Sequence, residues 1–150
     1  MRSWKDVSDV GSAITSWSGW VLVLLLPVTI ALPFLSRRAR RGLRGLPLRQ
    51  RLQPHYWLGY AIAAVVVVHA GVSTGTGVAL RADAPGVYLA TGALLLVFVQ
   101  MFLGLLLREP SLRRRRVVRR RHVWVMAGIV ALALGHIVLN SAVVHRLVPW

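Results

Sequence analysis

The sequence predicts an all-α fold, a polytopic four-helix bundle that spans a membrane. Of its 150 residues, 56% are hydrophobic and only 15% are charged. The charged residues gather in a few clusters between long apolar runs. Four of these runs approach the roughly 20 residues that an α-helix needs to cross a hydrocarbon core about 30 Å thick. We expect one domain, residues 1–150, with no internal repeat.

The four apolar runs are expected to be helices at roughly 17–35, 55–72, 87–107 and 123–144. The first begins with Trp17 and Trp20, which are typical of a membrane interface, and dense arginines follow it instead of preceding it. It is therefore a retained helix and not a signal peptide. Pro27 and Pro33 predict a kink in it. Residues 73–86, rich in turn formers, connect the second and third helices.

Basic residues predict the orientation in the membrane. The chain has nineteen basic and four acidic residues, a net charge of +15, and most basic residues lie in segments 37–51 and 108–121. Both segments follow apolar runs directly, so they indicate topology and contact with lipid headgroups, not a nucleic-acid partner. The positive-inside rule puts both clusters in the cytoplasm. We expect a multi-pass protein of the cell inner (cytoplasmic) membrane with both termini outside.

The absence of cysteine limits the chemistry. Disulfides, iron–sulfur clusters, thiolate zinc sites and covalently attached haem are excluded. The four acidic residues all lie outside the apolar runs, so paired carboxylates and acidic cation cages are not available in the membrane. Any metal site must depend on histidine.

Four of the five histidines share one spacing. The segments HYWLGYAIAAVVVVH (55–69) and HVWVMAGIVALALGH (122–136) each carry histidines fourteen positions apart. Fourteen helical residues turn through about 1400° and rise about 21 Å, so both histidines of a pair lie near one face. The predicted topology makes these two helices parallel, which brings His55 level with His122 and His69 level with His136. Two neutral imidazoles facing each other suit the axial positions of a haem iron.

Further residues have both functional and structural interpretations. Small residues at 59, 63, 133 and 135 would let a flat macrocycle approach the helices, although such residues are common in any membrane interface. Gln100 is a polar residue in the third helix that needs a partner, either a neighbouring helix or a quinone. His145 falls on the opposite face from His136, and we assign it no role.

The two histidine segments resemble the haem-binding helices of ferric reductase-like transmembrane domains, in which histidines about fourteen residues apart recur on two parallel helices. The resemblance covers nearly the whole chain and implies His55, His69, His122 and His136 as haem ligands. That family usually has six helices and a flavin and nucleotide domain, whereas no dinucleotide fingerprint occurs here. Respiratory cytochrome b is similar in its histidine pairs, but its first helix starts inside.

The expected function is transmembrane electron transfer by a small dihaem b-type cytochrome with two non-covalent haem b groups. His55 and His122 would bind the cytoplasmic-side iron, and His69 and His136 the outer-side iron. The chain would be an oxidoreductase subunit without catalytic residues of its own, in a respiratory or photosynthetic complex. Arginines close to the cytoplasmic site would pair with haem propionates or an acidic donor: Arg49, Arg51, Arg120 and Arg121. The alternatives are a haem-free structural or assembly subunit and a proton or metal-ion transporter with a histidine relay.

Overall fold

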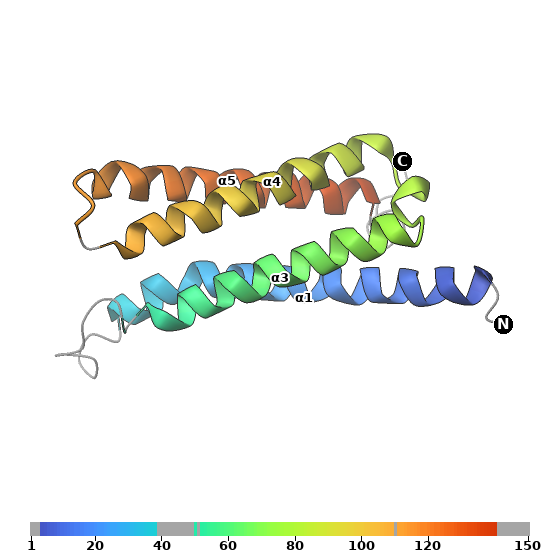
Figure 1. The fold of residues 1–150 in the computed structure, drawn as a ribbon, viewed down its shortest axis with the longest axis horizontal. Coiled ribbons are helices and arrows are strands. Elements are labelled where there is room, and N and C mark those ends of the chain that lie inside the picture. Colours follow the sequence, from blue (N-terminus) through green and yellow to red (C-terminus); the bar gives the residue numbers. More distant parts are fainter. Residues whose placement is uncertain (1–3, 39–49, 51, 110, 141–150) are drawn as a thin grey trace. The chain divides into compact units, whose positions relative to one another are not determined.

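The computed structural model describes residues 4–38, 50, 52–109 and 111–140, and these residues are almost entirely helical (Figure 1). The α-helices are α1 (Trp4–Arg38), α3 (Gln53–Gly75), α4 (Ala84–Arg108) and α5 (Arg115–Asn140). A short 3-10 helix, η2 (Ala79–Arg81), precedes α4. No strand occurs within the described ranges. The predicted all-α class is confirmed.

Each predicted helix is present, but two begin earlier than the hydropathy indicates. Helix α1 begins at Trp4 instead of near residue 17, and it continues through Pro27 and Pro33 to Arg38. Helix α5 begins at Arg115, so most of the second arginine cluster is helical. Most of the first arginine cluster, including Arg49 and Arg51, lies outside the described residues, as does His145.

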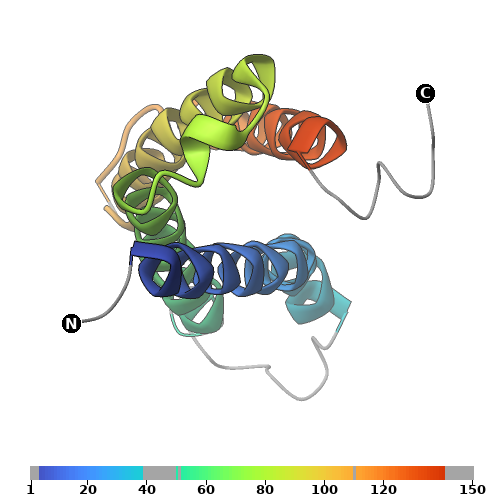
Figure 2. The same cartoon turned by 90° about the vertical axis from the view of Figure 1, so that its right-hand side faces the viewer.

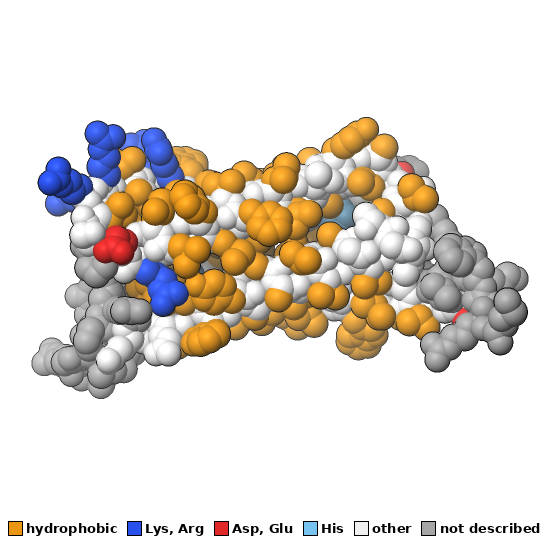
Figure 3. Space-filling view, viewed as in Figure 1, with side chains coloured by type: hydrophobic (Ala, Val, Ile, Leu, Met, Phe, Trp, Pro, Cys, Tyr) orange, Lys and Arg blue, Asp and Glu red, His pale blue; other side chains and the backbone are white. Residues whose placement is uncertain are grey.

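All four α-helices are long and apolar enough to cross a membrane, and the chain is a multi-pass membrane protein. Large apolar side chains are exposed along them: Trp17 is 74% exposed, Leu24 68% and Trp124 66%. Figure 3 shows hydrophobic side chains spread over the visible surfaces of the helices. Lipid, and not a protein core, would cover these side chains.

The chain divides into two units, residues 1–73 and 74–150. Each consists essentially of two antiparallel helices, which we call the first hairpin (α1 and α3) and the second hairpin (α4 and α5) (Figures 1 and 2). The helices of the first hairpin are joined by hydrogen bonds from histidines of α3 to α1. Each hairpin is described by itself below.

Glycines allow close packing within the second hairpin. A Cβ atom at any of three positions would approach a leucine of the opposite helix within 2.8–3.2 Å, namely Gly92 with Leu132, Gly128 with Leu96, and Gly135 with Leu89. Close approach of backbones at small residues is a main source of helix association in lipid, where no hydrophobic force draws helices together. Val97, Leu103 and Ile129 are buried in the same hairpin.

Polar contacts join the helices of the second hairpin at both ends. At the start of α4, the Asp83 N–H donates to Asn140 Oδ1 at 3.0 Å. At the other end, Arg115 Nη2 donates to the Leu107 carbonyl at 2.8 Å, which satisfies one of the last carbonyls of α4. These contacts hold the register of α4 against α5.

Candidate functional site

The four candidate histidines lie on α3 and α5. In each helix both histidines contact one neighbouring helix: those of α3 bond to α1, and those of α5 bond to α4. This shared face is what the spacing of fourteen residues predicts. The partner of each ring nitrogen then determines where its proton lies.

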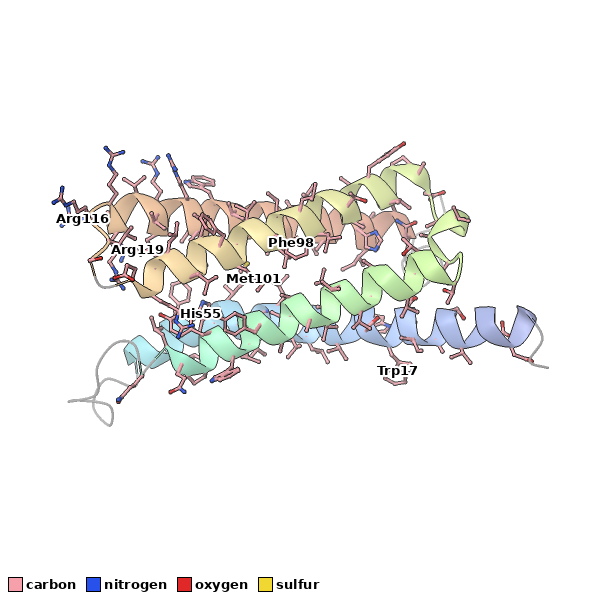
Figure 4. The ribbon with its side chains drawn as sticks, in the orientation of Figure 1. Trp17, His55, Phe98, Met101, Arg116 and Arg119 are labelled. Carbon is pink, nitrogen blue, oxygen red and sulfur yellow. The ribbon has the colours of Figure 1, made fainter. Side chains whose placement is uncertain are left out.

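His55 lies in the first turn of α3, on the side of α1 (Figure 4). Its Nδ1 is 2.9 Å from the carbonyl oxygen of Thr29, a residue that is only 2% exposed. A carbonyl oxygen accepts hydrogen bonds and cannot donate them, so Nδ1 carries the proton. The neutral ring therefore has its lone pair on Nε2.

His69 has the same tautomer for a different reason. Its Nδ1 is 2.9 Å from Ser18 Oγ. Ser18 Oγ also lies 2.7 Å from the carbonyl oxygen of Ile14, one turn earlier in its own helix. A hydroxyl that donates its single proton to Ile14 O accepts from His69 Nδ1–H, and the shorter distance to Ile14 O favours this arrangement. A Cβ atom at Gly19 would lie 3.5 Å from His69 Cε1, an ordinary contact with the ring.

His136 donates from Nδ1 to the carbonyl oxygen of Gly86 at 2.9 Å. Asn140 Nδ2 lies 3.3 Å from both this Nδ1 and the carbonyl oxygen of His136. An amide nitrogen only donates, so the carbonyl is its acceptor and the shorter bond to Gly86 places the ring proton. A Cβ atom at Gly86 would overlap the Asn140 side chain, which makes glycine necessary there for this packing.

His122 differs from the other three histidines. Gln100 Nε2 lies 3.2 Å from His122 Nε2, and because the amide can only donate, it occupies the Nε2 lone pair. Gln100 is 9% exposed, and its Oε1 has no hydrogen-bond partner among the described residues. The prediction that Gln100 needs a partner is thus met by a neighbouring helix. A Cβ atom at Gly104 would lie 3.7 Å from His122 Cε1.

The donor chemistry of His55, His69 and His136 fits haem ligation. A histidine that binds a metal through Nε2 usually donates its Nδ1–H to a carbonyl, carboxylate or water, which fixes the tautomer and makes the ring a better ligand. His122 does not meet this requirement, because its buried Nδ1 has no hydrogen-bond acceptor among the described residues and its Nε2 contacts Gln100. No group of three or more His, Cys, Asp or Glu side chains occurs in the described part of the chain, whereas a bis-histidine haem takes two per iron.

The glycines beside the histidine rings differ from those that the sequence predicts. Gly135 faces Leu89 of α4, where it serves the packing of the two helices. The rings of His69 and His122 instead lie beside Gly19 and Gly104, which the sequence analysis did not identify. The pairing of His55 with His122 and of His69 with His136 would join the two hairpins, and it stays a prediction.

The arginines of α5 lie at its first turns. Arg116 and Arg119 extend from this end (Figure 4), and basic side chains gather there in Figure 3. Arg120 and Arg121 are exposed. Exposed arginines next to a membrane-spanning segment can contact anionic headgroups or an acidic protein surface.

Comparison with known proteins found no matching family model, curated protein or solved structure. The four histidines and their hydrogen bonds are therefore the basis for the proposals below.

Proposed function

We propose that the chain is a dihaem b-type cytochrome that transfers electrons across the membrane as a subunit of a larger redox complex. One observation carries the proposal: His55, His69 and His136 hold their protons on Nδ1 by bonds to oxygen acceptors, which leaves the lone pair on the nitrogen that binds iron. The likeness of their spacing to ferric reductase-like domains supports the same conclusion.

The pairing follows from the order of the helices. If all four helices cross the membrane once, alternate helices would run in the same direction, and α3 and α5 would be parallel. Histidines fourteen residues apart on both helices then meet at two depths. His55 and His122 would hold one haem b near the cytoplasmic side, and His69 and His136 a second one near the outer side. With no cysteine in the chain, both haems would be bound non-covalently.

The haems would supply the one-electron chemistry when bound, and the protein supplies ligands, spacing and a medium of low dielectric constant. Ser18, Thr29 and Gly86 hold a proton on three of the rings and so orient them. Other subunits of a respiratory or photosynthetic complex would deliver and accept electrons, and a quinone is a candidate carrier. The cytoplasmic arginines would contact lipid headgroups, haem propionates or an acidic partner.

The second candidate is a haem-free structural or assembly subunit. It is favoured by the fact that each of the four histidines already bonds a neighbouring helix of its own hairpin. Hydrogen bonds between membrane helices contribute roughly 0.6 kcal/mol each on average. Stabilisation of helix association is therefore a sufficient reason for a histidine in a membrane helix. In that case the histidines would need no ligand at all.

The haem content of the purified protein decides between the two. After expression with sufficient haem, the cytochrome should carry two haem b groups per chain, with a six-coordinate, low-spin spectrum and complete extraction by acid–acetone. A colourless protein would refute the cytochrome and favour the structural subunit, whose histidine variants would lose stability only.

Four leucine variants then test the pairing. His69→Leu and His136→Leu should give matching spectra that keep the inner haem, and His55→Leu should match His122→Leu. A cross-pairing would have to span about 21 Å along the membrane normal. His145→Leu is the control and should change neither haem. If His69→Leu resembled His122→Leu, the parallel arrangement of α3 and α5 would be wrong.

A further inference from the structure

We propose that Pro33 is a positioning residue for His55, because it removes the helical donor of the Thr29 carbonyl and so leaves this oxygen for the imidazole. The hydrogen bond itself is a property of the first hairpin. Its consequence for a haem rests on the proposed function.

The inference starts from the hydrogen-bond ladder of α1. In an α-helix the carbonyl of residue i accepts from the N–H of residue i+4. The donor for Thr29 would come from residue 33, which is proline and has no N–H. Helix α1 nevertheless continues to Arg38. Thr29 is 2% exposed, and a carbonyl without a partner is costly at such a position in a membrane.

His55 supplies the donor that the proline removes. Its Nδ1 lies 2.9 Å from Thr29 O, twenty-six positions away in the sequence. His136 provides the contrast, since its acceptor is Gly86 O, whose helical donor at residue 90 is an alanine with an N–H. Gly86 O is thus shared between two donors, whereas no N–H at position 33 competes with His55 for Thr29 O.

This arrangement would hold the His55 proton on Nδ1 and keep the lone pair on Nε2. A bond from Nδ1–H to a carbonyl makes Nε2 a better ligand, which would stabilise the ferric form of a bound iron relative to the ferrous form. Proline in α1 would therefore make His55 a stronger ligand without contacting the haem itself.

The test uses the full chain in lipid nanodiscs, produced without haem and with ¹⁵N-labelled histidine. The ring ¹⁵N resonances report which nitrogen carries the proton, and His55→Leu identifies the His55 signals. The wild-type protein should show one tautomer of His55, protonated at Nδ1. Pro33→Ala restores an N–H that competes for Thr29 O, so the Nε2-protonated tautomer should appear beside it. Alanine favours helix, so this variant should fold.

Two variants serve as controls. Pro27→Ala makes the same substitution in the same helix, but the restored N–H would bond the carbonyl of residue 23, whereas the acceptor of His55 Nδ1 is Thr29 O. Thr29→Val removes the hydroxyl, which bonds Leu25 O, and keeps the backbone carbonyl. Both should leave the His55 signals unchanged. The His69 signals report the fold independently, because their acceptor is Ser18.

The inference is wrong if Pro33→Ala leaves His55 in the wild-type tautomer, or if Pro27→Ala changes it equally. These results need no haem, so they are separate from the outcome for the proposed function. In the haem-loaded protein, Pro33→Ala should also raise the midpoint potential of one haem only. The shift is about 59 mV for each tenfold loss of preference for the ferric form. A loaded protein with unchanged potentials would refute the effect on the ligand.

Discussion

A histidine inside a membrane needs partners for its ring nitrogens, because lipid offers none. Three of the rings have oxygen acceptors here: a side-chain hydroxyl for His69, the Thr29 carbonyl for His55, and the Gly86 carbonyl for His136. The fourth ring, His122, accepts from the Gln100 amide instead. At the scale of single residues, an acceptor for Nδ1–H should strengthen binding of a metal through Nε2, whereas a donor to Nε2 should weaken it.

Replacing Ser18 should weaken the outer site. Ser18→Ala removes the acceptor of His69 Nδ1–H, and leaving such a donor unsatisfied costs about 1–3 kcal/mol of stability. If His69 binds a haem as proposed, loss of a partner of this kind should also lower the affinity for that haem by about tenfold. Unfolding in detergent and haem titration measure the two effects.

The matched control is Ser12→Ala, in the same helix. The Ser12 hydroxyl is exposed and bonds Asp9 O. This variant should leave both stability and haem affinity near the wild-type values. Equal effects of the two substitutions would show that Ser18 does not act through His69.

If His122 binds the inner haem as proposed, replacing Gln100 should favour that binding. Gln100→Leu removes the donor that occupies the His122 Nε2 lone pair, so iron no longer competes with a bond of about 1 kcal/mol. We expect affinity for the haem held by His122 to rise by roughly fivefold, the equivalent of that energy, while the outer haem is unchanged. Titration of haem into the haem-free protein, with the two spectra resolved, provides the measurement. Weaker binding of the inner haem would mean that Gln100 assists ligation.

At the scale of elements, the second hairpin is built on close contact between α4 and α5. Its glycines face leucines of the opposite helix, and Arg115 and Asn140 close its two ends. The rings of His122 and His136 reach α4 acceptors or donors only because the helices approach so closely. Helix packing and histidine position should therefore change together.

Gly135→Ala tests this dependence. The added methyl group would lie 2.8 Å from Leu89 Cδ1, and overpacking of this kind costs about 1–3 kcal/mol unless the leucine moves. We expect a lower midpoint in detergent unfolding and a weakened bond from His136 to Gly86. Gly71→Ala on α3 is the control, since nothing lies within 4 Å of its Cβ position, and it should be neutral or slightly stabilising. A neutral result for both would show that α4 and α5 tolerate a wider spacing.

At the scale of the whole molecule, the arginines predict the direction in which the four helices cross the membrane. Most of the described arginines lie at the neighbouring ends of α4 and α5 and in the connection around Ser111, and η2 lies between α3 and α4. The positive-inside rule then puts Ser111 in the cytoplasm and Leu80 of η2 outside. These two residues lie on opposite sides of the membrane in either orientation, so they form a matched pair.

Labelling of single cysteines determines the orientation, because the chain has no cysteine of its own. Leu80 is 90% exposed, and Ser111 is also exposed. In intact cells, Leu80→Cys should react with a membrane-impermeant maleimide, whereas Ser111→Cys should react only after permeabilisation. The reverse pattern would place both termini in the cytoplasm and make respiratory cytochrome b the better comparison.

Hydropathy and spacing were sufficient to predict the all-α class, the four membrane helices and the common face of each histidine pair. These features depend on residues close together in one helix, and the period of the helix is constant. The helix ends were less well predicted. The segment before Trp17 and the arginines from Arg115 onward are too polar for a hydropathy signal, yet they continue the helical ladder that the membrane segments establish.

The sequence by itself therefore determined that His55, His69, His122 and His136 lie in membrane helices at matching intervals. Only the tertiary structure decided which nitrogen of each ring forms a hydrogen bond, and with which group. Pro33 could have revealed that the Thr29 carbonyl lacks its helical donor, but not that His55 supplies one. The partners Ser18, Gly86 and Gln100 lie on neighbouring helices. Contacts between helices depend on the rotation and register of one helix against the other, which no spacing within a single helix defines.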